Sequence, residues 1–202
     1  MSYQLLKSDV LFYQRFLMST GFYQGSLDGE WGPKTNKADT DFVAKSATIA
    51  QLYGSFDPRS EANIITLIPK AQIEARKFLK LAGANKDVRI ISGTRTYDEQ
   101  DILYNKGRNG TPGPIVSNAK GGQSNHNFGI AWDIGLFDNQ GKYITAEAEY
   151  KLLGPAIMPG ITTIEWGGDW ISFKDYPHYQ LKAINNSVSA IRNLFEKGET
   201  YA

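Results

Sequence analysis

The chain has 202 residues, enough for one medium domain or for a small module joined to a domain of about 150 residues. Hydrophobic residues make up 41% and charged residues 21%, and 22 lysines and arginines nearly balance 21 aspartates and glutamates, so nothing points to nucleic acid or an acidic membrane as a partner. The absence of cysteine excludes disulfides, thiolate nucleophiles and zinc sites built from cysteine.

The first predicted element is a helix close to the N-terminus. Apolar residues at 6, 10, 13 and 17 follow helical spacing, and Gly21 offers a stop. The opening "MSYQLLKSDVLFYQRF" lacks the apolar core of a secretory signal, and no run approaches the roughly 18 apolar residues of a membrane span. We therefore expect neither a signal peptide nor insertion into a membrane.

A glycine-rich turn and a second helix follow. "GFYQGSLDGEWGPKT" combines turn chemistry at Asp28 and Gly29 with Pro33 at a position suited to a first helical turn. Helical spacing then predicts a short helix that ends near residue 50, and "YGSFDPRS" (53–60) is typical of a linker. We expect a small helical module over residues 1–55 and a second domain over residues 60–202.

The second part of the chain mixes helices with short strands. Helical patterns occur at 71–82, from a capping box at 96 and 99 to about 108, around 146–158, and after Ser187. Strand patterns occur at 88–93, 130–137, 162–166 and 178–181, with a loop rich in Gly and Pro at 109–123. In "IAWDIGLF" (130–137), Asp133 lies on the same face as two small residues, which would leave its carboxylate room to point into a cavity. The expected fold class is α+β.

Both histidines of the chain lie near an aspartate. His126 precedes the strand that carries Asp133, and His178 lies three residues after Asp175. Two imidazoles and one carboxylate can hold a catalytic zinc ion that keeps a fourth position for water, and Asp175 would then serve as a base. Each histidine could equally be a core or surface residue with a local hydrogen-bond partner. The residues by themselves leave both interpretations open.

Three motif blocks carry a family resemblance. "SNHNFGIAWD" (124–133) and "EWGGDWISFKDYPHYQ" (165–180) resemble the paired signature of peptidoglycan-cleaving zinc peptidases related to D-alanyl-D-alanine carboxypeptidases. More narrowly, they resemble the L-alanyl-D-glutamate endopeptidases of bacteriophage endolysins and bacterial wall hydrolases. "SGTRTYDEQDILYNKGR" (92–108) is similar to a strand-then-helix segment of the same family. The resemblance covers roughly residues 70 to 182, with the blocks in the family's order.

The resemblance implies one zinc ion per chain, with His126, Asp133 and His178 as its ligands. It makes Asp175 the general base, and Arg95 the group that steadies the polarised carbonyl or a substrate carboxylate. The fold it implies is that of the hedgehog and D-Ala-D-Ala peptidases, a small antiparallel sheet with surrounding helices.

Three further positions follow from the same resemblance. Ser124 and Gln100 align with polar positions on the substrate side. Trp132 departs from the family pattern, which has a smaller aliphatic residue there more often, and we expect this change to affect packing and to leave the ligands intact.

The implied reaction is hydrolysis of a peptidoglycan stem peptide. Zinc lowers the pKa of water towards ~7 and polarises the scissile carbonyl, and Arg95 shares the developing oxyanion. Asp175 takes the proton of the water and hands it to the leaving amine. The "DYPH" form (175–178) favours the endopeptidase branch, which cuts the L-alanyl-D-glutamate bond. The alternatives are a D,D-carboxypeptidase, or a non-catalytic wall-binding protein with a structural metal site, which would have no use for a base at Asp175.

The N-terminal stretch "FLMSTGFYQGSLDGEWGPKTNKADTDF" (16–42) resembles a small helical peptidoglycan-binding module. The matching residues are Asp28, Gly29, Gly32, Pro33 and Thr35; the glycines and the proline are also explained by turn geometry. The resemblance implies peptidoglycan as the partner, bound through glycan or stem peptide. We expect a monomer that acts on the bacterial cell wall and is released through a phage holin and lysis, or by a dedicated export route.

Overall fold

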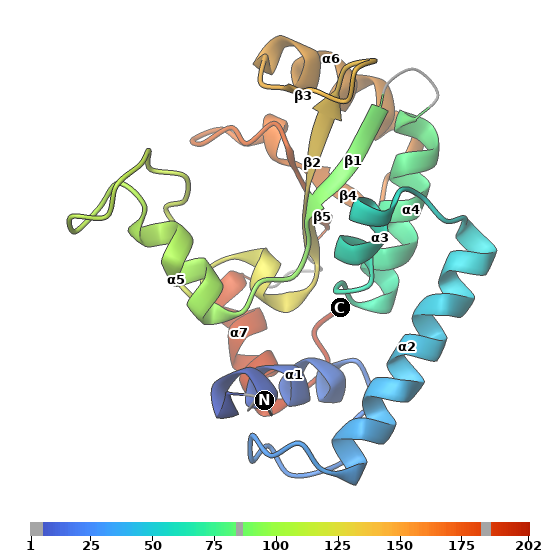
Figure 1. Cartoon of the computed structure of the whole chain (residues 1–202), viewed down its shortest axis with the longest axis vertical. Helices are drawn as coiled ribbons and strands as arrows, with labels where there is room; N and C mark the ends of the chain where they lie inside the picture. Colours follow the sequence, from blue (N-terminus) through green and yellow to red (C-terminus); the bar gives the residue numbers. More distant parts are fainter. Residues whose placement is uncertain (1–5, 84–86, 183–186) are drawn as a thin grey trace. The chain divides into compact units, whose positions relative to one another are not determined.

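The computed structural model describes residues 6–83, 87–182 and 187–202. Its elements, labelled in Figure 1, are α1 (Lys7–Ser19), α2 (Pro33–Tyr53), α3 (Pro58–Ile64), α4 (Pro69–Ala82), β1 (Asp87–Ser92), α5 (Tyr97–Asn105), η1 (Asn125–Phe128), β2 (Ala131–Phe137), β3 (Tyr143–Ile144), α6 (Glu147–Ile157), η2 (Met158–Gly160), β4 (Ile164–Trp166), η3 (Gly167–Asp169), β5 (His178–Leu181) and α7 (Val188–Lys197). Helices and a small antiparallel sheet make this an α+β fold, as predicted.

Internal contacts divide the chain into two compact units. Residues 1–45, 95–128 and 184–202 form the first, and residues 46–94 and 129–183 form the second. Each unit draws on segments that are far apart in the sequence. The division into residues 1–55 and 60–202 stays a prediction about which part folds alone.

Aromatic packing joins α1 to α7 in the first unit. The ring of Phe12 on α1 lies 5.1 Å from that of Phe195 on α7, and Phe195 lies 5.4 Å from Phe128 of η1. All three rings are buried. Ser187 begins α7 by accepting a hydrogen bond from the N–H of Ala190, as its predicted cap role requires.

A buried amide organises the glycine-rich turn of the same unit. Gln14 donates to Asp28 Oδ1 and to the carbonyl of Glu30, at 2.9 and 3.0 Å, and accepts from the N–H of Gly29 at 2.9 Å. Gly29 has a φ of +71°, a conformation that glycine adopts without strain. Pro33 is the first residue of α2, as predicted. The turn residues therefore serve the local fold.

The second unit is built on a five-stranded antiparallel sheet. The strand order is β1-β2-β5-β4, and β3 pairs with β2 off this path. Trp132 of β2 pairs with Tyr179 of β5, and both side chains are fully buried. The ring of Tyr179 lies 4.4 Å from that of Phe78 on α4, so this face of the sheet forms the core. Residues that alternate with Trp132 and Tyr179 lie on the opposite face.

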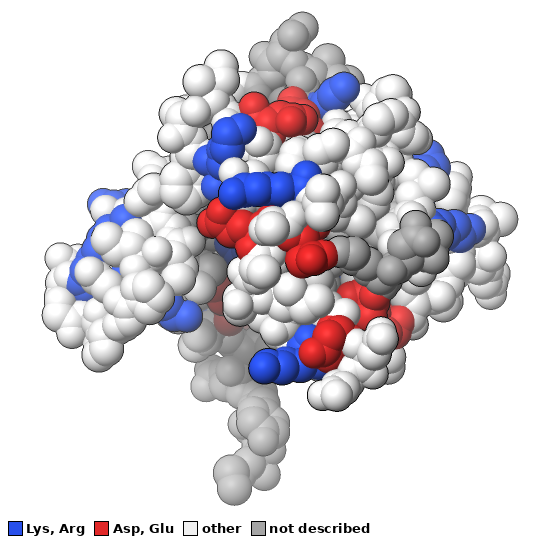
Figure 2. All heavy atoms as spheres, turned by 90° about the horizontal axis from the view of Figure 1, so that it is seen from above, with Lys and Arg blue, Asp and Glu red and all other residues white. Residues whose placement is uncertain are grey.

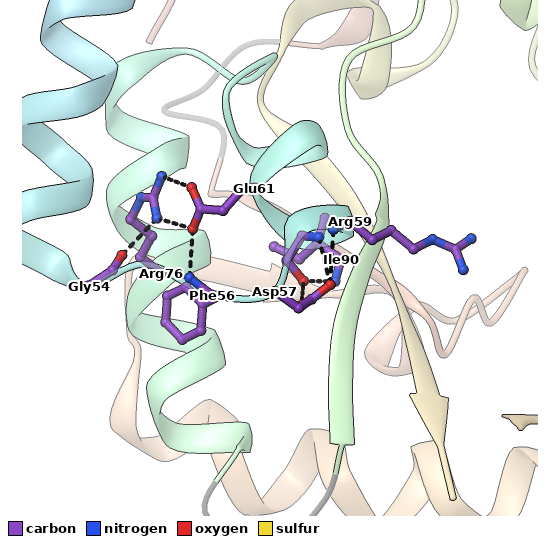
Figure 3. A network of polar contacts seen from close by, with 8 residues as sticks. Gly54, Phe56, Asp57, Arg59, Glu61, Arg76 and Ile90 are labelled. Atoms are coloured by element: carbon purple, nitrogen blue, oxygen red, sulfur yellow. Dashed lines mark hydrogen bonds and ion pairs between the residues drawn. The ribbon is translucent and has the colours of Figure 1, made fainter. Parts of the chain in front are cut away.

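Helix α3 covers the outer edge of β1, beside which it lies in Figure 1. The N–H of Ile90 donates to Ser60 Oγ at 2.9 Å, and the side-chain amide of Asn63 donates to the carbonyl of Ile90 at 3.1 Å. Asp57 caps the helix by accepting from the N–H groups of Arg59 and Ser60 (Figure 3). Both outward polar groups of Ile90 are thus satisfied by side chains of one short helix.

A buried ion pair ties α4 to α3 and to the residues before it (Figure 3). Arg76 donates to both carboxylate oxygens of Glu61, at 2.7 and 2.8 Å, and to the carbonyl of Gly54 at 2.7 Å. The N–H of Phe56 donates to Glu61 at 2.8 Å. The Arg76 side chain is fully buried, so the bidentate pair compensates for the water that its guanidinium has lost.

Several predicted boundaries are wrong. The second helix is not short: it runs to Tyr53, and its last two turns contain the good helix formers Ala47, Ala50, Gln51 and Leu52. Part of the predicted linker is helical, since Asp57 is a side-chain cap and Pro58 takes the first helical position of α3. The helix that starts at the capping box ends at Asn105 and not near residue 108. Strand β3 was not expected.

Charge is mixed on the surface. Figure 2 shows side chains of both signs interspersed on the face seen from above, in keeping with a net charge of +1. Within residues 6–83, 87–182 and 187–202, none of the helices combines the length and the apolar character needed to cross a membrane.

Replacing Glu61 by Ala should destabilise the protein, because it strips the buried Arg76 of its carboxylate partner. Removing one partner of a buried pair costs about 3–5 kcal/mol, and we expect a loss near the lower value because the Glu61 side chain is 25% exposed. The free energy of unfolding in urea measures the loss. Glu147→Ala is the control, since it removes the carboxylate of an exposed pair with Lys151. Equal losses in the two variants would contradict this account.

Candidate functional site

Strands β2 and β5 bring Asp133 and His178 together. The two residues are direct partners in the antiparallel register, so their side chains share the face of the sheet opposite Trp132. His178 Nδ1 lies 3.1 Å from Asp133 Oδ1, and the two side chains are 7% and 19% exposed. The strand pairing thus places an imidazole and a carboxylate side by side in a largely buried setting.

The two small neighbours of Asp133 do not act alike. Ala131 lies opposite Gln180 of β5. A Cβ on Gly135 would stand 2.9 Å from Ile91 and from Tyr143. The space at Gly135 is therefore filled by other side chains, and the predicted cavity does not extend past it.

The glycines of "EWGGDW" shape the segment that leads to His178. Gly167 lies against the carbonyl of Asp175, and a Cβ on it would also stand 3.1 Å from the Cβ of His178, so a side chain does not fit. The N–H of Asp175 donates to the carbonyl of Gly167 at 3.1 Å, and the N–H of His178 donates to the carbonyl of Asp175 at 3.2 Å. The carbonyl of Pro177 accepts from the N–H of Ile134 on β2 at 3.0 Å. The backbone of the predicted base is thus anchored to the sheet.

Opposing effects act on the imidazole of His178. Burial disfavours its charged form and lowers the pKa, but the hydrogen bond and the negative charge of Asp133 raise it, with further contributions from Gln180 and from the charge of Asp175. Together they hold the pKa of His178 above its usual value. Asp133 and Asp175 therefore both act electrostatically on this ring, which suits a place where a cation would bind.

His126 lies in η1, is 2% exposed, and has Arg95 as its neighbour. The backbone N–H of Arg95 donates to the carbonyl of His126 at 3.1 Å, and Arg95 Nη2 lies 3.3 Å from His126 Nε2. Because a guanidinium can only donate, Nε2 presents its lone pair. A lone pair on a buried imidazole is also what a metal ligand must offer.

Asn127 is a positioning residue that sequence reasoning missed. Its buried side-chain amide donates to the carbonyls of Arg95 and Thr96, at 2.9 and 3.2 Å. Its Oδ1 accepts from the N–H groups of Gly122 and Ser124, at 2.9 and 3.3 Å. One side chain therefore holds the Arg95 segment against the segment that leads into His126. Its place directly after His126, in a motif block, was the available signal.

Ser124 and Gln100, the predicted substrate-side positions, take part in this local frame. Ser124 Oγ accepts from the N–H of His126 at 3.4 Å. Gln100 is buried; it accepts from Arg95 Nη1 at 3.0 Å and donates to side-chain and backbone oxygens of the loop at 117–119, at 2.9 Å each. Their contacts to neighbouring residues are structural, and substrate binding by either stays a prediction.

The three predicted ligands form a group that could hold a metal ion. His126, Asp133 and His178 each offer one ligand atom, and these atoms lie within 4.8 Å of one another. Two imidazoles and one carboxylate fit a divalent metal of the zinc type, which takes nitrogen and oxygen ligands. The donor set is compatible with zinc, and zinc as the ion stays a prediction.

Three tryptophans lie on the two faces of the sheet that carries His178. Trp170 packs on its ring, with centroids 5.0 Å apart, and is partly exposed. Trp166 is 5% exposed and donates through Nε1 to the carbonyl of Tyr176 at 2.8 Å, which makes it a core residue. Trp132 is fully buried on the core face, in keeping with a packing role for this departure from the family pattern.

Parts of this chain are similar to known proteins. Residues 117–181 match the family described as D-alanyl-D-alanine carboxypeptidase. The peptidoglycan L-alanyl-D-glutamate endopeptidase CwlK of Bacillus subtilis (strain 168) is 43% identical to this chain over 112 residues. The alignment covers 51% of this chain and 66% of CwlK, so this chain spans slightly less than two thirds of the length of that relative. The crystal structure of the Serratia marcescens L-Ala D-Glu endopeptidase ChiX is similar with a TM-score of 0.48 and 24% identity, covering 63% of this chain and 89% of that one.

The segment that matches this family, residues 117–181, includes the three candidate ligands His126, Asp133 and His178. It also includes Asp175, the predicted base. Arg95 lies outside it. The part of the chain that carries the candidate metal group is therefore a match to the D-alanyl-D-alanine carboxypeptidase family, which supports the resemblance drawn from its motifs.

Proposed function

We propose that this chain is a zinc-dependent peptidase that cleaves the stem peptides of peptidoglycan at the L-alanyl-D-glutamate bond. The observation that carries the proposal is the group of His126, Asp133 and His178 inside the segment that matches the family. The choice of bond follows from the "DYPH" form of the last block and from the activity that the name of CwlK states.

In this proposal His126, Asp133 and His178 hold the ion. When bound, zinc acidifies water and polarises a scissile carbonyl. Within each unit the chain holds its own candidate ligands: the β2–β5 pairing fixes Asp133 beside His178, and Asn127 and the backbone N–H of Arg95 fix the segment of His126. Less ordering is then required when the metal and the substrate bind.

Asp175 is proposed as the general base. Its backbone is anchored through Gly167 and His178, and its charge acts on the imidazole of His178, so the carboxylate lies within electrostatic reach of a ligand. A base in this place takes a proton from the attacking water and returns it to the leaving amine. Arg95, 3.3 Å from His126 Nε2, supplies a fixed positive charge for the developing oxyanion.

Digestion of purified peptidoglycan should free the amino group of D-glutamate and leave L-alanine on the muramyl side. The expectation rests on the "DYPH" form and on the similarity to CwlK. Labelling of the new amino termini, followed by mass spectrometry of the fragments, identifies the bond. Release of terminal D-alanine alone would reassign the chain to D,D-carboxypeptidases, the activity that names the matching family.

Substitutions should separate ligand from base. His178→Ala should lose both the metal and the activity, because it removes a ligand. Asp175→Asn keeps the size and removes the charge, so the zinc content should stay near one per chain while turnover falls by roughly 10²–10⁴-fold, the usual contribution of a positioned general base. Elemental analysis and the hydrolysis rate are measured on each variant. An Asp175→Asn protein that loses its zinc, or keeps near-full activity, would assign this residue another role.

We further propose that residues 1–55 bind the wall, and that the chain works there as a monomer, reaching the wall through lysis or a dedicated export route. Trp31 offers a surface for such binding: it is 42% exposed and stacks on Tyr13 with ring planes 6° apart. Tyr13 is itself held by a hydrogen bond of 2.7 Å to Asp39. A rigid, exposed aromatic face supplies contact area at a small cost in side-chain entropy.

Trp31→Ala should weaken binding to intact walls and leave hydrolysis of soluble stem peptides unchanged, since tethering raises the effective concentration only at the wall. Binding is measured by co-sedimentation with purified wall sacculi, in an Asp175→Asn background so that the walls stay intact. Val43→Ala is the control, because Val43 is an exposed apolar residue of the same segment. If both variants sediment like the parent protein, Trp31 has no part in wall binding.

A further inference from the structure

A row of polar side chains crosses the face of the sheet that lies opposite Trp132 and Tyr179. His178 and Gln180 alternate along β5 and therefore point to the same face. His178 has Asp133 of β2 as its cross-strand partner, and Gln180 has Glu165 of β4. The four side chains lie on three adjacent strands, and His178 and Gln180 are 5% and 6% exposed.

These side chains contact one another in sequence. His178 Nδ1 lies 3.1 Å from Asp133 Oδ1, and His178 Nε2 lies 3.0 Å from Gln180 Oε1. Gln180 Nε2 donates to Glu165 Oε2 at 3.1 Å. Both nitrogens of the imidazole thus have a partner: Nδ1 faces Asp133 on the neighbouring strand β2, and Nε2 faces Gln180 on β5 itself.

The direction of the hydrogen bonds follows from Glu165. A carboxylate accepts hydrogen bonds and does not donate them, so Gln180 must turn its NH₂ group towards Glu165. Its carbonyl oxygen then faces His178, and Nε2 of the imidazole must donate to it. In a neutral ring the remaining lone pair is on Nδ1, the atom that faces Asp133.

We propose that Glu165 and Gln180 are positioning residues that fix the tautomer of His178, so that Nδ1 is its ligand atom beside Asp133. The metal part of this inference rests on the proposed function, and the hydrogen-bond direction rests on the sheet alone. Ligating histidines in proteins commonly donate their second N–H to a fixed acceptor, which orients the ring and raises its basicity. Here the acceptor is an amide, and a carboxylate on the next strand determines which way the amide points.

Three variants test the arrangement. Gln180→Leu removes the acceptor and should weaken zinc binding by roughly 10- to 100-fold, the usual effect of losing such a partner. The double exchange Glu165→Gln with Gln180→Glu keeps the total charge. The new carboxylate at 180 can accept the hydrogen bond from Nε2 of His178, and the new amide at 165 can donate to that carboxylate. Zinc affinity should therefore stay close to that of the parent protein. Glu147→Gln, at the exposed start of α6, is the control for a lost carboxylate. Affinity is measured by competition with a chelator.

A second readout separates positioning from packing. The chain has only two histidines, so the imidazole signals are simple to assign by ¹⁵N NMR. In zinc-loaded parent protein and in the exchange variant, His178 should carry its proton on Nε2. In metal-free protein, the Nε2 proton should show the downfield shift of a hydrogen-bonded group, and Gln180→Leu should remove that shift.

Two results would overturn the inference: coordination through Nε2 in zinc-loaded protein, or an exchange variant that binds zinc as poorly as Gln180→Leu. If the exchange variant does not fold, the test is which nitrogen of His178 binds zinc in the parent protein: Nδ1 supports the inference and Nε2 contradicts it. If the parent protein binds no zinc, the proposed metal centre fails, whereas the shift of the Nε2 proton in metal-free protein and in Gln180→Leu still decides whether Gln180 and Glu165 orient the ring.

Discussion

Asp133 faces His178 because β2 and β5 pair in one register, and a slip of one residue in either strand would turn that strand's side chain to the opposite face and separate the two. The register is held from the other side of the sheet, where Trp132 and Tyr179 are buried and Tyr179 packs against Phe78 of α4. Burial of large rings on one face therefore fixes the polar residues on the other. The departure at Trp132 adds apolar area at the residue next to Asp133, where the register matters most.

Polar residues of the candidate site are held by buried amides more than by charges. Asn127 connects the backbone at Arg95 and Thr96 with the segment before His126, and Gln100 connects Arg95 with a loop. An amide both donates and accepts, so it can join two segments without burying a net charge. Such a frame leaves the charges of the site available for a metal and a substrate.

Local chemistry made part of this structure predictable from the sequence. Alternation over 130–137 predicts β2 and its two faces, and the capping box at Thr96 and Glu99 is present as predicted. The motif blocks named His126, Asp133 and His178 as a set, and these residues do form a group that could hold a metal ion. Signals of this kind act within one element or one motif.

Other features depend on contacts between elements, which one sequence does not reveal. Gln180 and Glu165 lie opposite each other only because of the β4–β5 register. Strand β3 exists through pairing with the end of β2, and the space expected beside Gly135 is filled by Tyr143 of that strand. Helix α3 was not predicted, because Asp57 and Pro58 are typical both of a turn in a linker and of the start of a helix.

Helix α3 also protects one edge of the sheet against aggregation with other molecules of this protein. β1 ends the strand order, and the open side of an end strand is where a strand from another molecule can add. At Ile90 both backbone groups on that side are already occupied by Ser60 and Asn63. A foreign strand can join the sheet at this point only after α3 has come away, so a seven-residue helix protects the β1 edge against edge-to-edge aggregation.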